Sequence, residues 1–248
     1  MKVVLTRPQI DDMSAPLSPT ARPILMSAPM VRALLAGTKS QTRRALKYQP
    51  IDIIPMPKAP DREWVILEQR EPEPKGKLIR CRFGVPGDLL WVRESWQHAP
   101  QKYCSCPQPS EASPCDDWSE GTGCQSNRGE VIYAADGVTA PRWRPSIHMP
   151  RRVSRLTLTI TSVRVERLQD ISEADAKAEG IERCEGEDGW KLYGPLGRAI
   201  KCLDARSSYR SLWEEINGKG SWAANPWVWV IAFRPELRNV DEVPRAAA

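Results

Sequence analysis

The sequence of 248 residues has little phenylalanine and histidine, with two of each, and it has no long apolar run. No stretch approaches the roughly 20 apolar residues that a membrane-spanning helix needs. The first residues also lack the apolar core of a secretory signal. We therefore expect a soluble, cytoplasmic protein that does not bind a membrane. The net charge of +5 is mild. It permits contact with a polyanion but lacks the dense basic charge of a dedicated nucleic-acid-binding protein.

The sequence is instead rich in tryptophan, with ten residues, and 41% of all residues are hydrophobic. Most of the tryptophans lie in or beside predicted strands, where they suit cores as well as the rims of clefts. A chain of this length can form one elaborated domain or two small ones. We predict one domain over residues 22–238, a mobile lead over residues 1–21 and a tail over residues 239–248.

The prediction of fold and function starts from the segment Arg22–Arg44, RPILMSAPMVRALLAGTKSQTRR. A short apolar run at residues 24–26 predicts a buried strand. Pro29 suits the first turn of a helix, and Gly37 is a typical helix end. Four polar residues follow this helix end: Lys39, Thr42, Arg43 and Arg44. The plainest interpretation of this group is a basic, solvated helix end.

The remaining chain is predicted to form strands with two further helices, and it has no internal repeat. A long strand begins near Leu156, and its apolar alternation slips by one residue near Thr161-Ser162, which predicts a β-bulge. Ser172 and Asp175 form a capping-box-like helix start, and Gly180 would end that helix. Apolar residues at helical spacing predict the second helix, ending at Asn217. These residues are Tyr209, Leu212, Trp213 and Ile216. The apolar run 227–233 predicts a last strand buried on both faces.

A polar segment, residues 97–127, holds four of the seven cysteines: Cys104, Cys106, Cys115 and Cys124. Crowded thiols in a chain without an export signal favour a metal site over disulfides. Their spacing, however, fits no standard zinc module. Two interpretations stay open, a structural zinc held by the four thiolates and a loop of free thiols. A four-thiolate zinc would have no open position for a substrate.

Four motifs, in this order, resemble the ASCH family of small PUA-like domains. The first is Gly-x-Lys-x-x-Thr-x-Arg, which starts at Gly37, and the second is GDLLWVRESW, which starts at Gly87. The others are VRVERLQDISEADAKAEGI and the apolar strand WVWVIAF. The resemblance covers residues 22 to about 234, and the fuller wording is similar to a longer ASCH-like type associated with phages and prophages. It implies an α+β fold, a mixed or antiparallel PUA-like β-barrel with a few short helices. Insertions would lie at about 48–77, 97–127 and 182–203.

The resemblance also implies an activity, because some ASCH proteins are amidohydrolases that remove the acyl group of N4-acetylcytidine. Their proposed catalytic residues match Lys39, Thr42 and Glu179. A Thr hydroxyl needs a neighbouring base to become a nucleophile. Lys39 could be that base if burial or nearby cations lowered its pKa. Glu179, near a helix end, would pass a proton to the leaving amine. Each residue also has a plain interpretation: a solvated lysine, a capping threonine and an exposed glutamate.

Further candidates would bind the substrate. Arg44 completes the motif and would contact the substrate or orient Glu179, with Arg43 beside it. Glu94 is the rival carboxylate. Trp96 could stack on a pyrimidine, and His148 could line the cleft, although both residue types are common in structural roles.

We expect a small nucleoside as substrate, no cofactor for catalysis and no obligate protein partner. The main alternative is a non-catalytic PUA-like RNA-binding module, in which Lys39, Arg43 and Arg44 would contact phosphates. A third interpretation is a phage accessory protein. Binding through phosphates weakens steeply with salt, whereas turnover of a neutral nucleoside does not, so salt dependence separates the first two.

Overall fold

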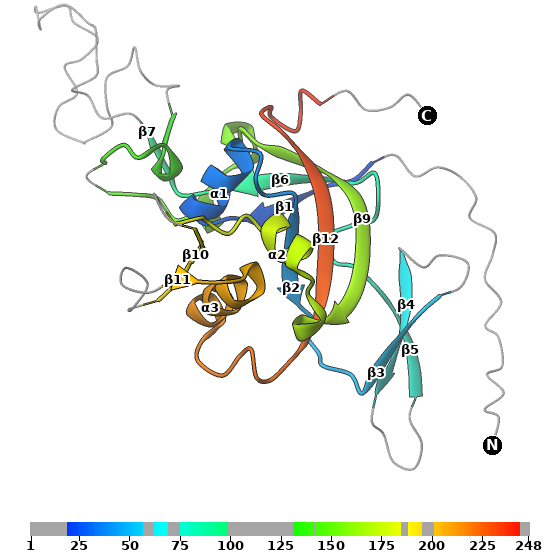
Figure 1. Ribbon diagram of the computed structural model, residues 1–248. Coiled ribbons are helices and arrows are strands. Elements are labelled where there is room, and N and C mark those ends of the chain that lie inside the picture. Colours follow the sequence, from blue (N-terminus) through cyan, green and yellow to red (C-terminus); the bar gives the residue numbers. More distant parts are fainter. Residues whose placement is uncertain are drawn as a thin grey trace, which may run out of the picture.

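A computed structural model describes residues 19–56, 62–68, 75–98, 131–140, 142–184, 188–194 and 201–243, and these residues form an α+β structure (Figure 1). Its centre is a five-stranded sheet in the order β1-β6-β9-β12-β2. The strands are β1 (Ala21–Leu25), β2 (Gln41–Ala45), β6 (Leu89–Arg93), β9 (Thr157–Arg167) and β12 (Trp227–Glu236). β1 runs parallel to β6, and the other pairs are antiparallel. The predicted α+β class is therefore confirmed.

The described strands do not close into a barrel, since β1 and β2 end the sheet without pairing with each other. Three smaller sheets complete the strand content. They are β3-β4-β5 (Asp52–Pro55, Glu63–Glu68, Lys75–Arg80), β7-β8 (Trp96–His98, Val131–Tyr133) and β10-β11 (Trp190–Lys191, Lys201–Cys202).

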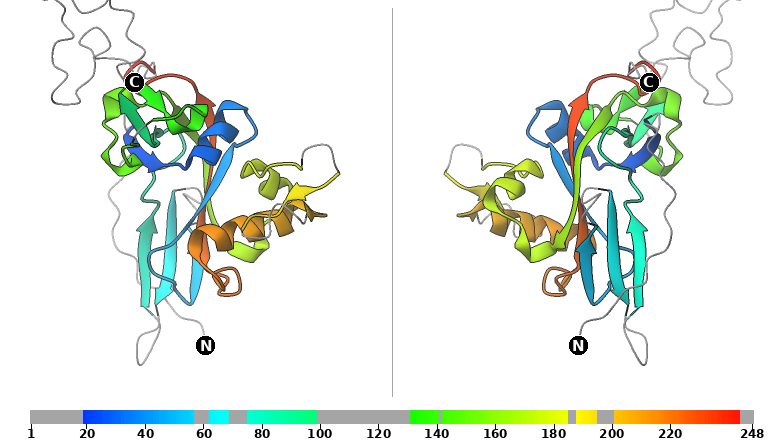
Figure 2. Two further views of the ribbon diagram at one scale, coloured as in Figure 1. Left: turned by 90° about the vertical axis from the view of Figure 1, so that its left-hand side faces the viewer. Right: turned by 90° about the vertical axis from the view of Figure 1, so that its right-hand side faces the viewer.

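Strand β12 separates two hydrophobic cores, as its unbroken apolar sequence predicted. Trp229, Ile231 and Phe233 pack into a cluster that includes Trp64 of β4, whereas Val228 and Val230 pack into a second cluster. The second cluster is formed with α2 (Glu173–Ala178) and α3 (Ala205–Asn217). Figure 2 shows these helices on one side of the long strands and the β3–β5 sheet on the other.

The predicted β-bulge in β9 is also present. Ala232 pairs with Ser162, whereas the next residue, Phe233, pairs with Ile160, so Thr161 is the extra residue. The bulge changes which face the following side chains occupy. Both Ile160 and Val163 therefore reach the same core.

The segment that contains the motif differs from a solvated helix end. Helix α1 (Ala28–Leu35) has a proline in its first turn, and Gly37 follows with φ +70°, as predicted. Residues 41–45, however, form strand β2, which lies at the edge of the central sheet beside β12. Lys39 lies just before it in an isolated β-bridge with Glu179. Strand pairing, rather than a helix end, therefore sets the positions of the motif residues.

Helices α2 and α3 begin at side-chain caps. Ser172 Oγ accepts a hydrogen bond from Asp175 N at 3.1 Å, and Asp204 Oδ1 accepts one from Ser207 N at 2.7 Å. Glu179 is the C-cap of α2, and Gly180 follows with φ +78°. The predicted start and end of α2 are confirmed, and so is the predicted end of α3 at Asn217.

Specific contacts are described at both ends of the predicted domain. Asn239 donates hydrogen bonds to Arg151 O and Ser154 O, and Val240 is buried against Leu89 and Trp91. The folded part thus extends past residue 238. At the other end, Thr20 N donates to Asp88 Oδ1 at 2.8 Å, and β1 starts at residue 21. Residues 1–18 of the predicted lead lie outside the described residues.

Of the three predicted insertions, the first is part of the main core. Residues 52–80 contain the β3–β5 sheet, and its residues Ile53, Trp64 and Ile66 pack into the cluster that includes Trp229. Most of the second insertion and part of the third lie outside the described residues. Among the described residues, four short 3-10 helices lie outside the predicted insertions: η3 (Ala134–Asp136), η4 (Ser146–His148), η5 (Arg151–Val153) and η6 (Leu168–Asp170).

Candidate functional site

A small cavity of about 80 Å³ lies where α1, β2, the end of α2 and α3 meet. Five of the eight residues predicted for catalysis and substrate binding line it: Lys39, Thr42, Arg43, Arg44 and Glu179. The rest of its wall is Met30, Ala45 and one face of α3, which contributes Tyr209, Leu212, Trp213, Ile216 and Asn217. Residues that are far apart in sequence thus form one site.

Lys39 is buried, with 1% of its surface exposed, which excludes the interpretation as a solvated lysine. Its Nζ donates to Glu179 O at 2.7 Å and lies 3.1 Å from Glu179 Oε2. Burial lowers the pKa of Lys39 below 10.5, since the ammonium form loses hydration. Glu179 opposes this change, while Arg44 and Arg43 add to it. A lowered pKa is the condition that a lysine must meet to act as a general base.

Glu179 is buried as well, and its two carboxylate oxygens have different partners. Oε2 faces Lys39, whereas Oε1 accepts a hydrogen bond from Arg43 Nη1 at 3.2 Å. Both partners of this side chain are cationic residue types. Glu179 is thus held in one orientation between them.

Arg43 is the centre of a charged network, and its side chain has no exposed surface. Besides Glu179, its Nη2 donates to Glu166 Oε1 at 2.5 Å and to Asp175 Oδ2 at 3.1 Å. Arg164 pairs with the same two carboxylates, at 3.0 Å and 2.7 Å. The residue that orients Glu179 is therefore Arg43, whereas the sequence suggested Arg44 for this role.

Thr42 and Arg44 complete the polar part of the wall. They lie on the face of β2 opposite to Arg43, because side chains alternate along a strand. All three still line the cavity, which a strand at the edge of a sheet permits. Arg44 Nη2 donates to Leu25 O at 2.7 Å, which ties the guanidinium to β1. Within the described residues no hydrogen bond joins the Thr42 hydroxyl to Lys39.

Helix α3 supplies wall residues that the sequence analysis treated only as a packing face. Tyr209 and Trp213 are buried, and the Arg43 guanidinium lies 5.9 Å from the Tyr209 ring centre. Burial raises the pKa of Tyr209 well above 10, so the phenol stays neutral. Trp213 Nε1 is a buried donor without a hydrogen-bond partner among the described residues. The sequence showed the helical period of α3, but it did not show that this helix lines the same cavity as Thr42.

Glu94 does not line this cavity. It forms a separate network, where Arg155 Nε donates to Glu94 Oε1 at 2.9 Å and Arg155 Nη2 also contacts Asp136 at 2.7 Å. The Arg155 guanidinium lies 3.9 Å from the centre of the Tyr133 ring. Burial raises the pKa of Glu94, against the opposing effect of Arg155. This arrangement fixes η3 and β8 against β6, which is a structural role.

Trp96 and His148 also lie outside the Lys39 cavity. Trp96 is buried, and its ring packs edge-on against His98 with ring centres 5.3 Å apart. His148 is exposed on η4 and lines a second cavity, described below. Neither residue is positioned to contact a substrate beside Lys39.

The cysteines of the predicted zinc loop lie outside the described residues. In the part of the chain that the structure describes, no group of three or more His, Cys, Asp or Glu could hold a metal ion. The described helices are also too short or too polar for any of them to cross a membrane.

Comparison of the chain with protein-family models, curated proteins and solved structures found no match.

Proposed function

We propose that the protein is an amidohydrolase that removes the acyl group from N4-acetylcytidine or a related N4-acylated cytosine nucleoside, on an open, PUA-like variant of the ASCH fold. The observation that carries the proposal is the burial of Lys39 in the same cavity as Thr42 and Glu179. Burial lowers the pKa of Lys39, which favours its free amine form. A free amine can act as a general base toward a nearby hydroxyl.

The chemistry uses these three side chains in sequence. As Thr42 Oγ1 attacks the acyl carbon, its proton moves to Lys39 Nζ. The carbon–nitrogen bond then breaks, and the proton passes through Glu179, which lies 3.1 Å from Nζ, to the cytosine amine. An acyl ester on Thr42 and free cytidine result. Water then attacks the ester carbon and gives a proton to Lys39. The ester bond to Thr42 Oγ1 breaks, the carboxylic acid leaves, and Lys39 passes that proton to Thr42 Oγ1, which restores the free amine and the hydroxyl.

The wall of the cavity fits this reaction. Its volume of about 80 Å³ is well below the roughly 300 Å³ of typical ligand pockets. We therefore expect it to enclose the acyl amide, with the ribose directed to solvent. Arg44 lines the cavity and would donate to the acyl oxygen as negative charge develops there. Tyr209 and Trp213 would pack against the flat pyrimidine.

The charge balance of the site favours catalysis over the RNA-binding alternative. Lys39 and Arg43 are buried and already paired with Glu179, Glu166 and Asp175. Phosphate binding by these two cations would require breaking those pairs, and each unpaired buried carboxylate is costly.

The test is incubation with N4-acetylcytidine, followed by its ultraviolet absorbance. Lys39→Ala and Thr42→Ala should each abolish turnover, and Thr42→Ser should retain part of it. Thr38→Ala is the matched control, because Thr38 is exposed and its hydroxyl donates only to Ala33 O. Unchanged turnover in Lys39→Ala or Thr42→Ala, with unchanged circular dichroism, would refute the catalytic role of that residue.

The same assay distinguishes the role of Glu179 from that of Glu94. Glu179→Gln cannot relay a proton and should lower kcat about 100-fold or more, with little change in KM. Glu94→Gln should leave kcat near the wild-type value, since Glu94 lies outside the cavity. If Glu94→Gln loses kcat while Glu179→Gln stays active, the role of Glu179 is wrong.

A further inference from the structure

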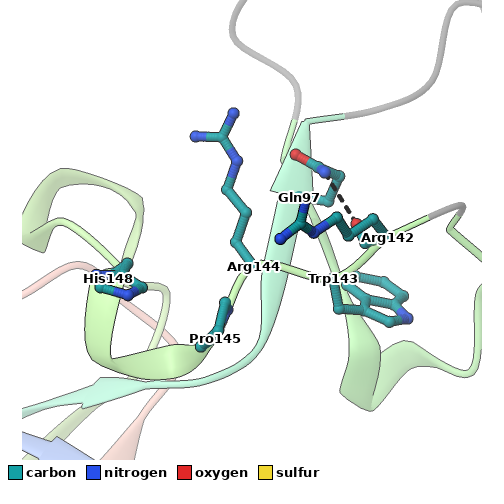
Figure 3. A pocket seen from close by; sticks show the side chains of 6 residues that line it. All are labelled: Gln97, Arg142, Trp143, Arg144, Pro145 and His148. Atoms are coloured by element: carbon teal, nitrogen blue, oxygen red, sulfur yellow. Dashed lines mark hydrogen bonds between the residues drawn. The ribbon is translucent and has the colours of Figure 1, made fainter.

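A second cavity, of about 370 Å³, lies between β7 and the segment that leads into η4 (Figure 3). Its lining residues are Gln97, Arg142, Trp143, Arg144, Pro145 and His148. None of them lines the Lys39 cavity. Its volume falls within the range of roughly 300–1,000 Å³ that is usual for small-molecule sites.

The charge of this cavity differs from that of the Lys39 cavity. Arg142 and Arg144 are exposed, and neither forms an ion pair with a described acidic residue. No Asp or Glu is among the lining residues. Guanidinium groups that are not neutralised by carboxylates can bind phosphate through two parallel hydrogen bonds. The cavity is therefore suited to an anion.

The backbone around the arginines is fixed by strand pairing. Trp96 N donates to Arg144 O at 3.2 Å, and Arg144 N donates to Trp96 O at 2.9 Å. Gln97 Nε2 donates to Arg142 O at 2.9 Å, the dashed line in Figure 3. The Arg144 guanidinium also lies 5.1 Å from the Trp96 ring centre. These contacts hold the two arginines in place without occupying all their donors.

Trp143 lies between the two arginines in sequence and adds an aromatic surface to the cavity wall. Its side chain is half-buried, and Figure 3 shows it across the pocket from His148. A base can stack on such a ring, while the adjacent phosphate contacts arginine. Trp96, beneath Arg144, is buried and is not available for stacking.

We propose that this pocket binds a nucleotide unit of single-stranded nucleic acid, with the phosphate on Arg142 and Arg144 and the base stacked on Trp143. This site goes beyond the proposed amide hydrolysis and does not depend on it. A free nucleotide has the same chemistry, so the experiment must distinguish a strand from a mononucleotide.

The first measurement is fluorescence anisotropy of the full chain with a labelled single-stranded RNA of about eight nucleotides. The double variant Arg142→Gln with Arg144→Gln should bind at least about tenfold more weakly. Its plot of log affinity against log salt should be shallower by about 0.7, because the two arginines together neutralise one phosphate of the strand. The control is Arg80→Gln with Arg234→Gln, which removes the same charge from side chains that are 72% and 73% exposed. It should keep the wild-type slope.

The second measurement concerns the base. Trp143→Ala should weaken RNA binding about tenfold, and Trp143→Phe should restore most of it. Neither variant should change binding of inorganic polyphosphate, which has no base. In competition, an unlabelled strand should displace the labelled RNA at far lower nucleotide concentration than cytidine monophosphate does.

Three outcomes would overturn the proposal. Equal loss of affinity in the pocket variant and the control variant would show that only net charge matters. Displacement by cytidine monophosphate as effective as by the strand would assign the pocket to free nucleotides. Stronger displacement by polyglutamate than by RNA would assign it to an acidic protein segment. Amide hydrolysis is not used in either measurement, so failure of the proposed function would leave these results unaffected.

Discussion

Gly180 lies at the end of α2 and packs closely against Ala33 of α1 and against Lys39. Replacing Gly180 with alanine tests this close packing. A Cβ at Gly180 would lie 2.8 Å from Ala33 Cβ and 2.8 Å from Lys39 Cβ. Both neighbours are Cβ atoms attached directly to backbone, so they cannot move away by a side-chain rotation. Gly180 also has φ +78°, a conformation that disfavours every L-residue with a Cβ.

Gly37 provides a matched control, because it has a similar φ of +70° with nothing within 4 Å of the added Cβ. Gly37→Ala should therefore cost only the left-handed conformation, about 1–2 kcal/mol. Gly180→Ala should cost the same amount plus about 1–3 kcal/mol for overpacking. The expected total for Gly180→Ala is about 2–5 kcal/mol.

Urea unfolding followed by circular dichroism measures both values. With a slope near 3 kcal/mol/M, the midpoint should fall by roughly 0.3–0.7 M for Gly37→Ala and roughly 0.7–1.7 M for Gly180→Ala. Equal midpoints for the two variants, with unchanged slopes, would show that Gly180 does not approach Ala33 and Lys39 as described. If the close approach holds, Gly180→Ala should also lower amide hydrolysis, because the added methyl displaces Lys39 or Glu179.

Three further predictions concern the charged groups. Arg43→Met removes the shared partner of three carboxylates, of which Glu166 and Asp175 keep Arg164 and Glu179 keeps Lys39. It should destabilise the protein by about 1–3 kcal/mol in urea unfolding, and an unchanged free energy of unfolding would contradict the network. Because burial lowers the pKa of Lys39, the folded state holds fewer protons than the unfolded state between that lowered value and 10.5. Stability should therefore rise with pH across this window relative to Lys39→Met, and parallel pH profiles would refute this. If the cysteine loop binds zinc, elemental analysis should find about one equivalent, and chelation should lower the Tm without ending hydrolysis.

Local features of the chain were predictable where a short-range rule decides the structure. The bulge at Thr161 follows from a one-residue slip of alternation, and the start of α2 follows from a serine three residues before an acidic residue. The two-sided burial of β12 follows from its unbroken apolar run. In each case the determining residues are neighbours in sequence.

The positions of the site residues were predictable only in part, because they depend on long-range packing. The motif gave Lys39, Thr42 and Glu179 as a set, and the structure brings them together. It did not indicate that Arg43 rather than Arg44 binds Glu179, since this depends on which face of β2 meets α2. Only the family resemblance favoured Glu179 over Glu94, because the residue that holds Glu94 outside the cavity, Arg155, lies 61 residues away in sequence.

The pair Lys39–Glu179 offers a way to separate a catalytic from a stabilising role. Breaking a buried ion pair on one side leaves a charge unpaired, whereas replacing both partners with apolar residues is often neutral or stabilising. Lys39→Met combined with Glu179→Leu should therefore keep the free energy of unfolding within about 1 kcal/mol of the wild type, or raise it. Arg43 retains Glu166 and Asp175 in this variant. The same variant should have no amide hydrolysis. If the double variant instead unfolds at far lower urea than the wild type, the pair stabilises the fold, and a catalytic reason for burying these two residues is no longer needed.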